Sequence, residues 1–375
     1  MFRLTHGYCL IGLVAWLACS HIERGRESIQ HGDAGSIIDA SAPDDLSVEA
    51  SSGDSHESPH GEPDERLTKC GPSRTLMFAY KHQIPEGDVS FISPYIAVNS
   101  RDLFCLLSWE YPVEAGIARR GALVRIPLTG GSFEMLASLP DGAGQSTHTL
   151  LATETHVVYT RAGQSLEDPE LIVSHHLDDG ESMILAQGSG RIYALTGDAE
   201  QVYFIDGDAV NSVSLNGSEV QNLRSPRVNS IRLADQTLYL ADDGTVSALS
   251  IETREIREVA RDQAWPMYPL RCGNDVCWTN VGGLFASTIV RAAPGQMPRV
   301  LASGFSEPHD LVFDGQQFFL SSGAGGLRLD RIPAEGGEPS TVAGGIGMAS
   351  LALDDDCLYW ADFEGVWSIL RINPE

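Results

Sequence analysis

The chain has 375 residues, with 51 acids against 25 bases, a formal net charge of -26 at pH 7 and 42% hydrophobic residues. The hydrophobic fraction is large enough for a sizeable buried core. A negative field of this size repels nucleic acid and anionic lipid. We therefore exclude nucleic acid as a partner, and we exclude a membrane contact other than one made through a covalent lipid.

The first twenty residues have the pattern of an export signal. Arg3 is the only charged residue before the apolar run Cys9 to Ala18, which is too short to span a bilayer. The sequence Ala18-Cys19-Ser20 resembles a bacterial lipobox, which implies a signal peptide over residues 1–19 and acylation at Cys19. An ordinary secretory cut near Ala18 is the alternative. We expect an exported protein of the bacterial periplasm or cell surface, as an outer-membrane lipoprotein.

Residues 20–70 form a second segment of distinct composition. Serine, aspartate, glutamate, glycine and proline dominate it, and large apolar residues are sparse. Such a segment buries too little surface to offset the conformational entropy of ordering the chain. We predict a disordered acidic tether between the anchor and a folded domain over residues 71–375.

The clearest structural pattern lies at the end of the chain. Ser350 to Asp354 and Leu358 to Asp362 alternate as short strands around the turn residues Asp355-Asp356, and Val366 to Ile372 is a third strand. The same frame recurs upstream at intervals of about 40 residues. If Tyr359 is taken as the anchor of the last copy, the anchors of the others are Phe104, Val158, Tyr203, Tyr239, Cys277 and Phe319.

Four strands in about 40 residues make one blade of a β-propeller. The frame predicts an all-β propeller of seven four-stranded blades, with six as the alternative. The last copy ends without room for a fourth strand. We predict that Thr75 to Tyr80 supplies this strand and closes the ring, because pairing the chain ends removes an open sheet edge.

Two repeats carry a resemblance to known families. Leu358-Tyr359-Trp360-Ala361-Asp362 resembles the YWTD repeat of receptor-type propellers, and Pro308-His309-Asp310-Leu311 resembles NHL and streptogramin-lyase-like repeats. The whole chain is similar to uncharacterised bacterial propeller lipoproteins of the myxobacterial type. The resemblance covers residues 75–375, is at the level of the fold, and implies no particular function.

The starts of the innermost strands supply the first candidate site. These positions surround the mouth of a propeller's central channel and include His148, Tyr193, Asn229, His309 and Asp310. They are candidates for binding a ligand, and two imidazoles with a carboxylate are also a donor set for a divalent metal. The alternative is a water-filled channel lined by ordinary polar residues.

An enzyme is the rival reading of the same positions. The resemblance to streptogramin lyases implies a metal-assisted lyase or lactonase with His148, His309 and Asp310 as its catalytic group. No residue here matches the acidic metal ligand of those lyases. We therefore expect no catalytic residues and no cofactor, with a divalent metal left open.

Two further sets of residues belong to loops. The insertion Trp109 to Arg120 offers Trp109 and Tyr111 as aromatic anchors of the kind found at interfaces. Acidic loops such as Asp206-Gly207-Asp208 and Asp242-Asp243-Gly244 are candidates for calcium or a basic partner. Solvated turns are the alternative that we favour.

The cysteines predict one disulfide by spacing. Cys272 and Cys277 lie across an expected hairpin, and an exported protein can oxidise them to a clip. Cys70 and Cys357 could staple the closure of the ring, whereas Cys105 is expected to be a buried strand residue.

The sequence as a whole predicts a monomeric, envelope-anchored propeller that acts as a binding or scaffolding protein. Its ligand, a protein or a small molecule, stays unidentified. The metal-assisted enzyme and an assembly component without a pocket are the alternatives.

Overall fold

The computed structural model describes residues 75–79, 91–113, 116–129, 132–139, 149–161, 168–224, 227–283, 285–323, 328–344, 350–362 and 365–370. The chain divides into two units, Met1–Asp64 and Glu65–Glu375, and the described residues all belong to the second. The predictions about the signal peptide, Cys19, the tether, Cys70 and His148 lie outside these ranges. Within them, no helix is long and apolar enough to cross a membrane.

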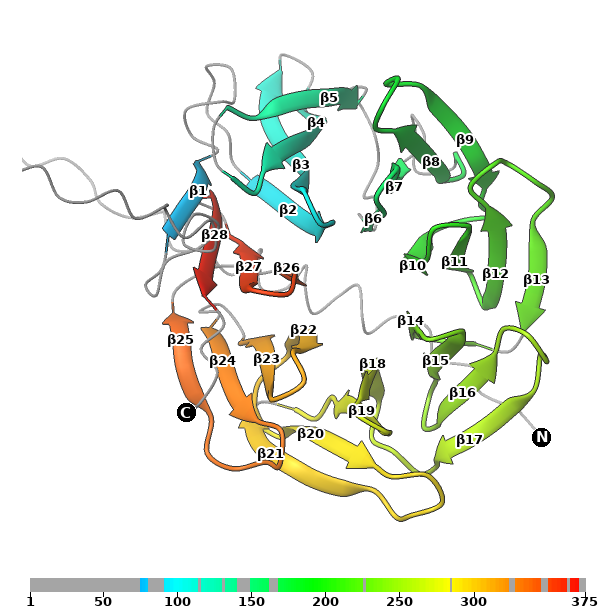
Figure 1. The fold of residues 1–375 in the computed structure, drawn as a ribbon, viewed down its shortest axis with the longest axis vertical. Helices are drawn as coiled ribbons and strands as arrows, with labels where there is room; N and C mark the ends of the chain where they lie inside the picture. The colour runs from blue at the N-terminus through cyan, green and yellow to red at the C-terminus, as the bar shows by residue number, and fades with distance from the viewer. Residues whose placement is uncertain are drawn as a thin grey trace, which may run out of the picture. The chain divides into compact units, whose positions relative to one another are not determined.

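The described strands form seven four-stranded antiparallel sheets, which stand as blades around a central axis (Figure 1). The first strand of each blade lies innermost and the fourth lies outermost, except in the last blade. Blade 1 contains β2 (Phe91–Val98), β3 (Asp102–Val113), β4 (Gly116–Pro127) and β5 (Glu134–Leu139). Blade 2 contains β6 (Leu150–Ala152), β7 (His156–Arg161), β8 (Leu171–His176) and β9 (Ser182–Gln187).

The next three blades repeat the same order. Blade 3 contains β10 (Ile192–Gly197), β11 (Gln201–Asp206), β12 (Ala209–Ser214) and β13 (Gln221–Arg224). Blade 4 contains β14 (Ser230–Ala234), β15 (Thr237–Ala241), β16 (Val246–Ser250) and β17 (Ile256–Ala260). Blade 5 contains β18 (Pro266–Cys272), β19 (Asp275–Asn280), β20 (Ser287–Ala292) and β21 (Arg299–Phe305).

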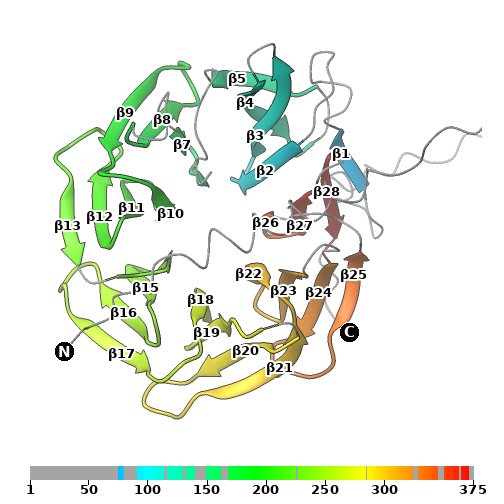
Figure 2. The same ribbon diagram turned by 180° about the vertical axis from the view of Figure 1, so that it is seen from behind.

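The last two blades include the closure of the ring. Blade 6 contains β22 (Pro308–Phe313), β23 (Gln317–Ser322), β24 (Arg328–Pro333) and β25 (Ser340–Gly344). Blade 7 contains β26 (Ser350–Leu353), β27 (Cys357–Ala361), β28 (Gly365–Leu370) and the N-terminal strand β1 (Thr75–Ala79). Strand β1 pairs antiparallel with β28, and both views show them side by side (Figures 1 and 2). The predicted propeller, its seven blades and its closure are confirmed.

The anchor residues of the repeat all lie on the second strand of a blade, where the sheet is buried on both faces. Tyr359 and Phe104 are fully buried, and Trp278 and Trp360 beside the anchors are equally inaccessible. Seven hydrophobic clusters occupy the described residues, one at each seam between neighbouring blades. Because burying one large side chain stabilises by roughly 1.5–3 kcal/mol, the seams hold the ring together.

The insertion after the second strand of blade 1 is part of the sheet rather than a separate loop. Strands β3 and β4 continue their pairing through it, with Trp109 opposite Arg120 and Tyr111 opposite Ala118. The insertion therefore lengthens a hairpin beyond the edge of the blade.

The two faces of the ring carry different connections. Face A has the turns that join first to second strands and third to fourth strands. Face B has the loops that join second to third strands and one blade to the next. The hairpin of blade 1 and the channel-mouth candidates, at the starts of innermost strands, lie on face B.

On face A, the turns between first and second strands share one hydrogen-bonding arrangement. In blade 7, Asp354 Oδ1 accepts the backbone N–H groups of Asp356 and Cys357. Asn99, Thr153, Asp198 and Asp314 occupy the same place in four other blades and accept equivalent bonds. Short polar side chains cap turns in this way, so the acidic run Asp354-Asp355-Asp356 belongs to the turn.

Candidate functional site

Asp310, at the channel mouth, is held within the framework of the ring. Its Oδ1 accepts hydrogen bonds from Leu311 N at 2.8 Å and Arg232 Nη2 at 3.4 Å, and its Oδ2 accepts Leu351 N at 3.0 Å. Leu351 belongs to blade 7, so the carboxylate of blade 6 ties its own innermost strand to the next. Both oxygens are engaged, which leaves this carboxylate poorly suited to hold a metal.

In two other blades, the residue equivalent to Asp310 also accepts a backbone hydrogen bond from the next blade. Ser230 Oγ accepts the Tyr268 N–H of blade 5 at 3.2 Å, and Ser350 Oγ accepts the Ile96 N–H of blade 1 at 3.3 Å. Like Asp310, each lies nine residues before its anchor. The ring of polar residues read from the repeat therefore joins neighbouring innermost strands at three seams.

Arg232 connects two blades that are not neighbours, blades 4 and 6. From β14 of blade 4, its Nη1 donates to the carbonyl of Leu311 in blade 6 at 2.9 Å, and its Nη2 reaches Asp310. Tyr268 of blade 5 lies within this group. Burial, followed by the nearby charge of Asp310, raises the pKa of its phenol above the ordinary value. Tyr268 is therefore neutral and packs into the channel wall.

The other channel-mouth candidates have their own partners. The His309 ring bonds to the backbone of Gly323, and burial lowers the pKa of the imidazole. Asn229 Nδ2 donates to Asp243 Oδ1 at 3.2 Å, whereas Tyr193 is half exposed. Among the described residues, no group of three or more His, Cys, Asp or Glu is arranged to hold a metal ion. His148 is not among the described residues.

The acidic loops of face B are explained by local bonding. Asp206 accepts the N–H and hydroxyl of Ser189, and Asp242 caps its own turn through Gly244 and Thr245. Asp243 receives the amide of Asn229 and lies 3.8 Å from Arg227. These carboxylates stabilise loops, as the turn interpretation expected.

A pocket that the sequence did not predict lies on face A, at the seam between blades 2 and 3. It has a volume of about 590 Å³. Strands β7, β8 and β9 and the turn between β8 and β9 supply one wall, and blade 3 supplies the other. The lining residues are His156, Ser174, His176, Asp179, Glu181, Ser182, Met183, Ala199, Glu200, Gln201, Ser214, Leu215 and Asn216.

The residue opposite the anchor differs among the repeats. Arg125 in blade 1 and Arg291 in blade 5 occupy this place, and their guanidinium groups bond to Asp102 at 2.6 Å and to Asp275 at 2.5 Å. Blade 6 has a third arginine there, Arg331, and blades 3, 4 and 7 have a small residue: Ser212, Ala248 and Ser368. In blade 2 the residue opposite the anchor is Ser174, which lines the pocket.

Ser174 is also unusual in its hydrogen bonding. Only 3% of the residue is exposed, and its Oγ has no hydrogen-bond partner. A buried hydroxyl without a partner costs roughly 1–3 kcal/mol. Ser174 is one of the residues that line the pocket, so this unsatisfied hydroxyl belongs to the pocket's lining.

Two imidazoles form the wall beside Ser174. The rings of His156 and His176 meet edge to face with centroids 4.8 Å apart, and His156 Nδ1 lies 2.9 Å from Thr155 Oγ1. His176 Nδ1 lies 2.9 Å from Asp179 Oδ1, but it lacks the alignment of a hydrogen bond. We treat this contact as electrostatic.

The electrostatics of the pocket follow from burial and neighbouring charge. Burial, and then the neighbouring His176, lowers the pKa of His156, so its imidazole is neutral near pH 7. A backbone hydrogen bond from Glu181, with a smaller contribution from His176, lowers the pKa of Asp179. With Glu181 and Glu200 on the same lining, carboxylates dominate the charge of the pocket.

The sequence contained only a partial signal for this site. His156 lies two residues before its anchor, where blades 1 and 5 have Asp102 and Asp275, and Ser174 lies opposite the anchor, where those blades have arginine. Four other blades also lack this Asp–Arg pair, so its absence does not by itself identify blade 2.

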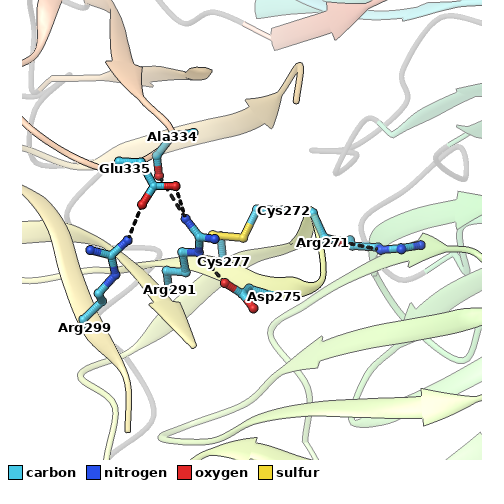
Figure 3. The surroundings of a disulfide bond; sticks show 9 residues. Arg271, Cys272, Asp275, Cys277, Arg291, Arg299, Ala334 and Glu335 are labelled. Atoms are coloured by element: carbon cyan, nitrogen blue, oxygen red, sulfur yellow. Dashed lines mark hydrogen bonds and ion pairs between the residues drawn. A yellow bond between two sulfur atoms is a disulfide. The ribbon is translucent and has the colours of Figure 1, made fainter. Parts of the chain in front are cut away.

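The predicted clip between Cys272 and Cys277 is present on face A, with a Cα–Cα distance of 5.9 Å. Beside it, Arg291 and Arg299 converge on Glu335 of blade 6 at 3.0 and 2.9 Å (Figure 3). Arg271 pairs with Asp235 of blade 4. Cys357 is disulfide-bonded, and Cys105 is buried in β3. The clip thus lies in a region that links three blades.

Comparisons with known proteins support the fold. No family model and no curated protein matches the chain. It is similar to the β-propeller domain of the trilobed protease of Pyrococcus furiosus, at 9% identity and TM-score 0.55, over 77% of this chain and 97% of that one. It is also similar to an oligogalacturonate lyase in complex with manganese, at 12% identity and TM-score 0.50, over 77% and 99%.

BamB from Moraxella catarrhalis matches at 11% identity and TM-score 0.45, over 71% of this chain and 82% of that one. The matches to the protease domain and the lyase establish that the chain is a β-propeller. At these identities they show the fold alone. The narrower resemblance to YWTD and NHL repeats stays a prediction.

Proposed function

We propose that this protein is a binding protein of the bacterial envelope, and that its propeller takes a small polar ligand in the pocket between blades 2 and 3. The observation that carries this proposal is a cavity of about 590 Å³ whose lining includes Ser174, a buried residue with an unpartnered hydroxyl. Ligand pockets combine such a volume with a few convergent polar groups. Ser174, His156 and Asn216 supply hydrogen-bonding groups here, and Met183 and Leu215 supply apolar contact.

The surrounding framework supports the same assignment. On face A, Glu154 of blade 2 accepts Ser100 and Arg101 interacts with the same turn, which links blades 1 and 2. Arg271 links blade 5 to blade 4, and Arg291 links blade 5 to blade 6. In the described residues, no side-chain hydrogen bond or ion pair joins blades 2 and 3 on this face, and the pocket opens there.

The envelope location rests on the sequence of the first twenty residues. With Cys19 acylated, the propeller would be held at the membrane by lipid, and its strong negative charge would disfavour direct contact with anionic headgroups. A Cys19→Ala variant expressed in a bacterium tests this assignment. Incorporation of labelled palmitate should be lost, and the protein should pass to the aqueous phase on detergent partition; continued labelling would contradict it.

A metal-assisted lyase is the second candidate, and the similarity to an oligogalacturonate lyase in complex with manganese favours it at the level of the fold. Its catalytic group would be His148, His309 and Asp310. The engagement of both Asp310 oxygens in backbone and arginine bonds weighs against this role. Elemental analysis of the purified propeller beside a His148→Ala/His309→Ala variant separates the two: stoichiometric metal that the variant loses would favour the enzyme.

The binding proposal is tested by screening polar compounds against three proteins. Amines, amino acids, sugars and carboxylates are screened by ligand-observed NMR with the wild type, Ser174→Arg and His309→Ala. Ser174→Arg fills the pocket with a side chain that blades 1 and 5 already accommodate at this position. Compounds that bind the wild type and His309→Ala but not Ser174→Arg are the expected result. Binding lost only in His309→Ala would move the site to the channel mouth.

A further inference from the structure

We propose that the ligand of this pocket carries a guanidinium group, either as a small molecule or as an arginine side chain of a partner. This inference rests on the proposed function and names its ligand class. It is carried by three independent features: the equivalent seams of the same molecule, the charge of the lining, and the hydrogen-bonding capacity of the pocket.

The repeats provide an internal template. At the seam between blades 5 and 6, the guanidinium of Arg291 lies between Asp275 of its own blade and Glu335 of the next. At the seam between blades 1 and 2, Arg125 pairs with Asp102. Both arginines reach the face A end of their seam from the position opposite the anchor. In blade 2 the corresponding residue is Ser174, which lines the pocket, so no arginine of the chain's own occupies this position at the seam between blades 2 and 3.

The charge of the pocket selects a cation. Asp179, Glu181 and Glu200 line it, and no lysine or arginine does. The His156 imidazole does not cancel this charge near neutral pH, because burial and the neighbouring His176 ring lower its pKa. An anion would meet repulsion from the carboxylates, whereas a cation gains from each of them.

Hydrogen-bonding capacity distinguishes guanidinium from ammonium. A guanidinium is planar, presents five N–H donors and is more weakly hydrated than an ammonium. The pocket offers several separated acceptors, the carboxylates of Asp179, Glu181 and Glu200. A planar group with several donors can reach more than one of them at once.

The test uses a matched pair of probes, N-acetyl-arginine methylamide and its ureido analogue, the citrulline derivative. They have similar shape, but the ureido compound lacks the positive charge. We expect titration calorimetry of the propeller at low salt to give binding that is about tenfold tighter for the arginine compound, because charge-assisted hydrogen bonds are the stronger class. The difference should shrink as salt is raised.

Variants of the lining separate this proposal from the proposed function. Ser174→Arg should abolish binding of both probes, and Glu181→Gln and Glu200→Gln should each weaken the arginine compound by about two- to fivefold, the range of an exposed ion pair. Circular dichroism checks that each variant folds. If Ser174→Arg does not fold, Met183→Arg blocks the pocket from its exposed rim.

The outcomes are distinct. Equal affinity for both probes, lost in Ser174→Arg, would overturn the guanidinium assignment and leave the pocket as a ligand site. Binding of neither probe would also overturn the guanidinium assignment. Binding of both probes unaffected by Ser174→Arg and Met183→Arg would overturn the assignment and the pocket together. Agmatine, a small guanidinium compound without a peptide backbone, serves as a third probe. Tighter binding of the capped arginine compound than of agmatine would indicate that the natural ligand is an arginine side chain of a partner rather than a small molecule.

Discussion

Replacement of Asp310 by alanine tests whether the channel-mouth carboxylate holds the ring together. The change removes the acceptor of Leu351 N, and Leu351 is only 6% exposed. A buried donor left without a partner costs about 1–3 kcal/mol. The Arg232 contact, partly exposed, adds less than about 1 kcal/mol, so we expect a loss of about 2–3 kcal/mol in the free energy of unfolding.

Urea denaturation followed by tryptophan fluorescence measures this loss as a lower midpoint. Asp310→Asn, which keeps one side-chain acceptor, should lose about half as much. The matched control is Asp208→Ala, which removes an exposed carboxylate from a turn of blade 3 and should change stability by less than about 0.5 kcal/mol. If the Asp310→Ala variant is as stable as the control, Asp310 does not stabilise the ring, and its role as a ligand-binding or metal-binding residue has to be considered again.

Three other predictions concern stability. Burial holds the pKa of His156 and His309 below their ordinary 6.5, so the unfolded chain binds more protons below that pH. Stability should be full above pH 7 and decline toward pH 5.5 in urea melts, and a His309→Gln variant that declines equally would contradict the contribution of His309. Replacing Cys272 and Cys277 by serine should cost about 2 kcal/mol for a loop this short, and an unchanged urea midpoint would contradict it. Asp354→Ala removes the acceptor of two backbone N–H groups and should lower the melting temperature, whereas equal substitution at exposed Asp355 should not.

The propeller could be predicted because each level of the sequence agrees with the fold. The anchors recur within short apolar runs, the turns carry asparagine, aspartate or threonine at one fixed place, and the N-terminal strand lies ahead of the first full copy. Such agreement between strand pattern and turn chemistry specifies a repeat strongly. The same periodicity found the disulfide, since Cys272 takes the capping position of its turn.

The site was harder to predict for a physical reason. Chemistry was expected where polar residues cluster in the repeat, but Asp310, Ser230 and Ser350 cluster there to accept backbone N–H groups from the next blade. The pocket lies between turns of blades 2 and 3, and its lining residues are scattered over both blades and form no motif. Its identification required the packing of these turns, which the repeat pattern does not specify.

The central claim is that ligand binds between blades 2 and 3 rather than at the channel mouth. Methionine methyl NMR tests it directly, because Met183 lines the pocket and Met267 lies on the innermost strand of blade 5. Signals are assigned with Met183→Leu and Met267→Leu variants and followed during titration with the capped arginine compound and any other compound that binds. The account predicts that the Met183 signal shifts with saturation while the Met267 signal stays. A shift of Met267 with Met183 unmoved would contradict it.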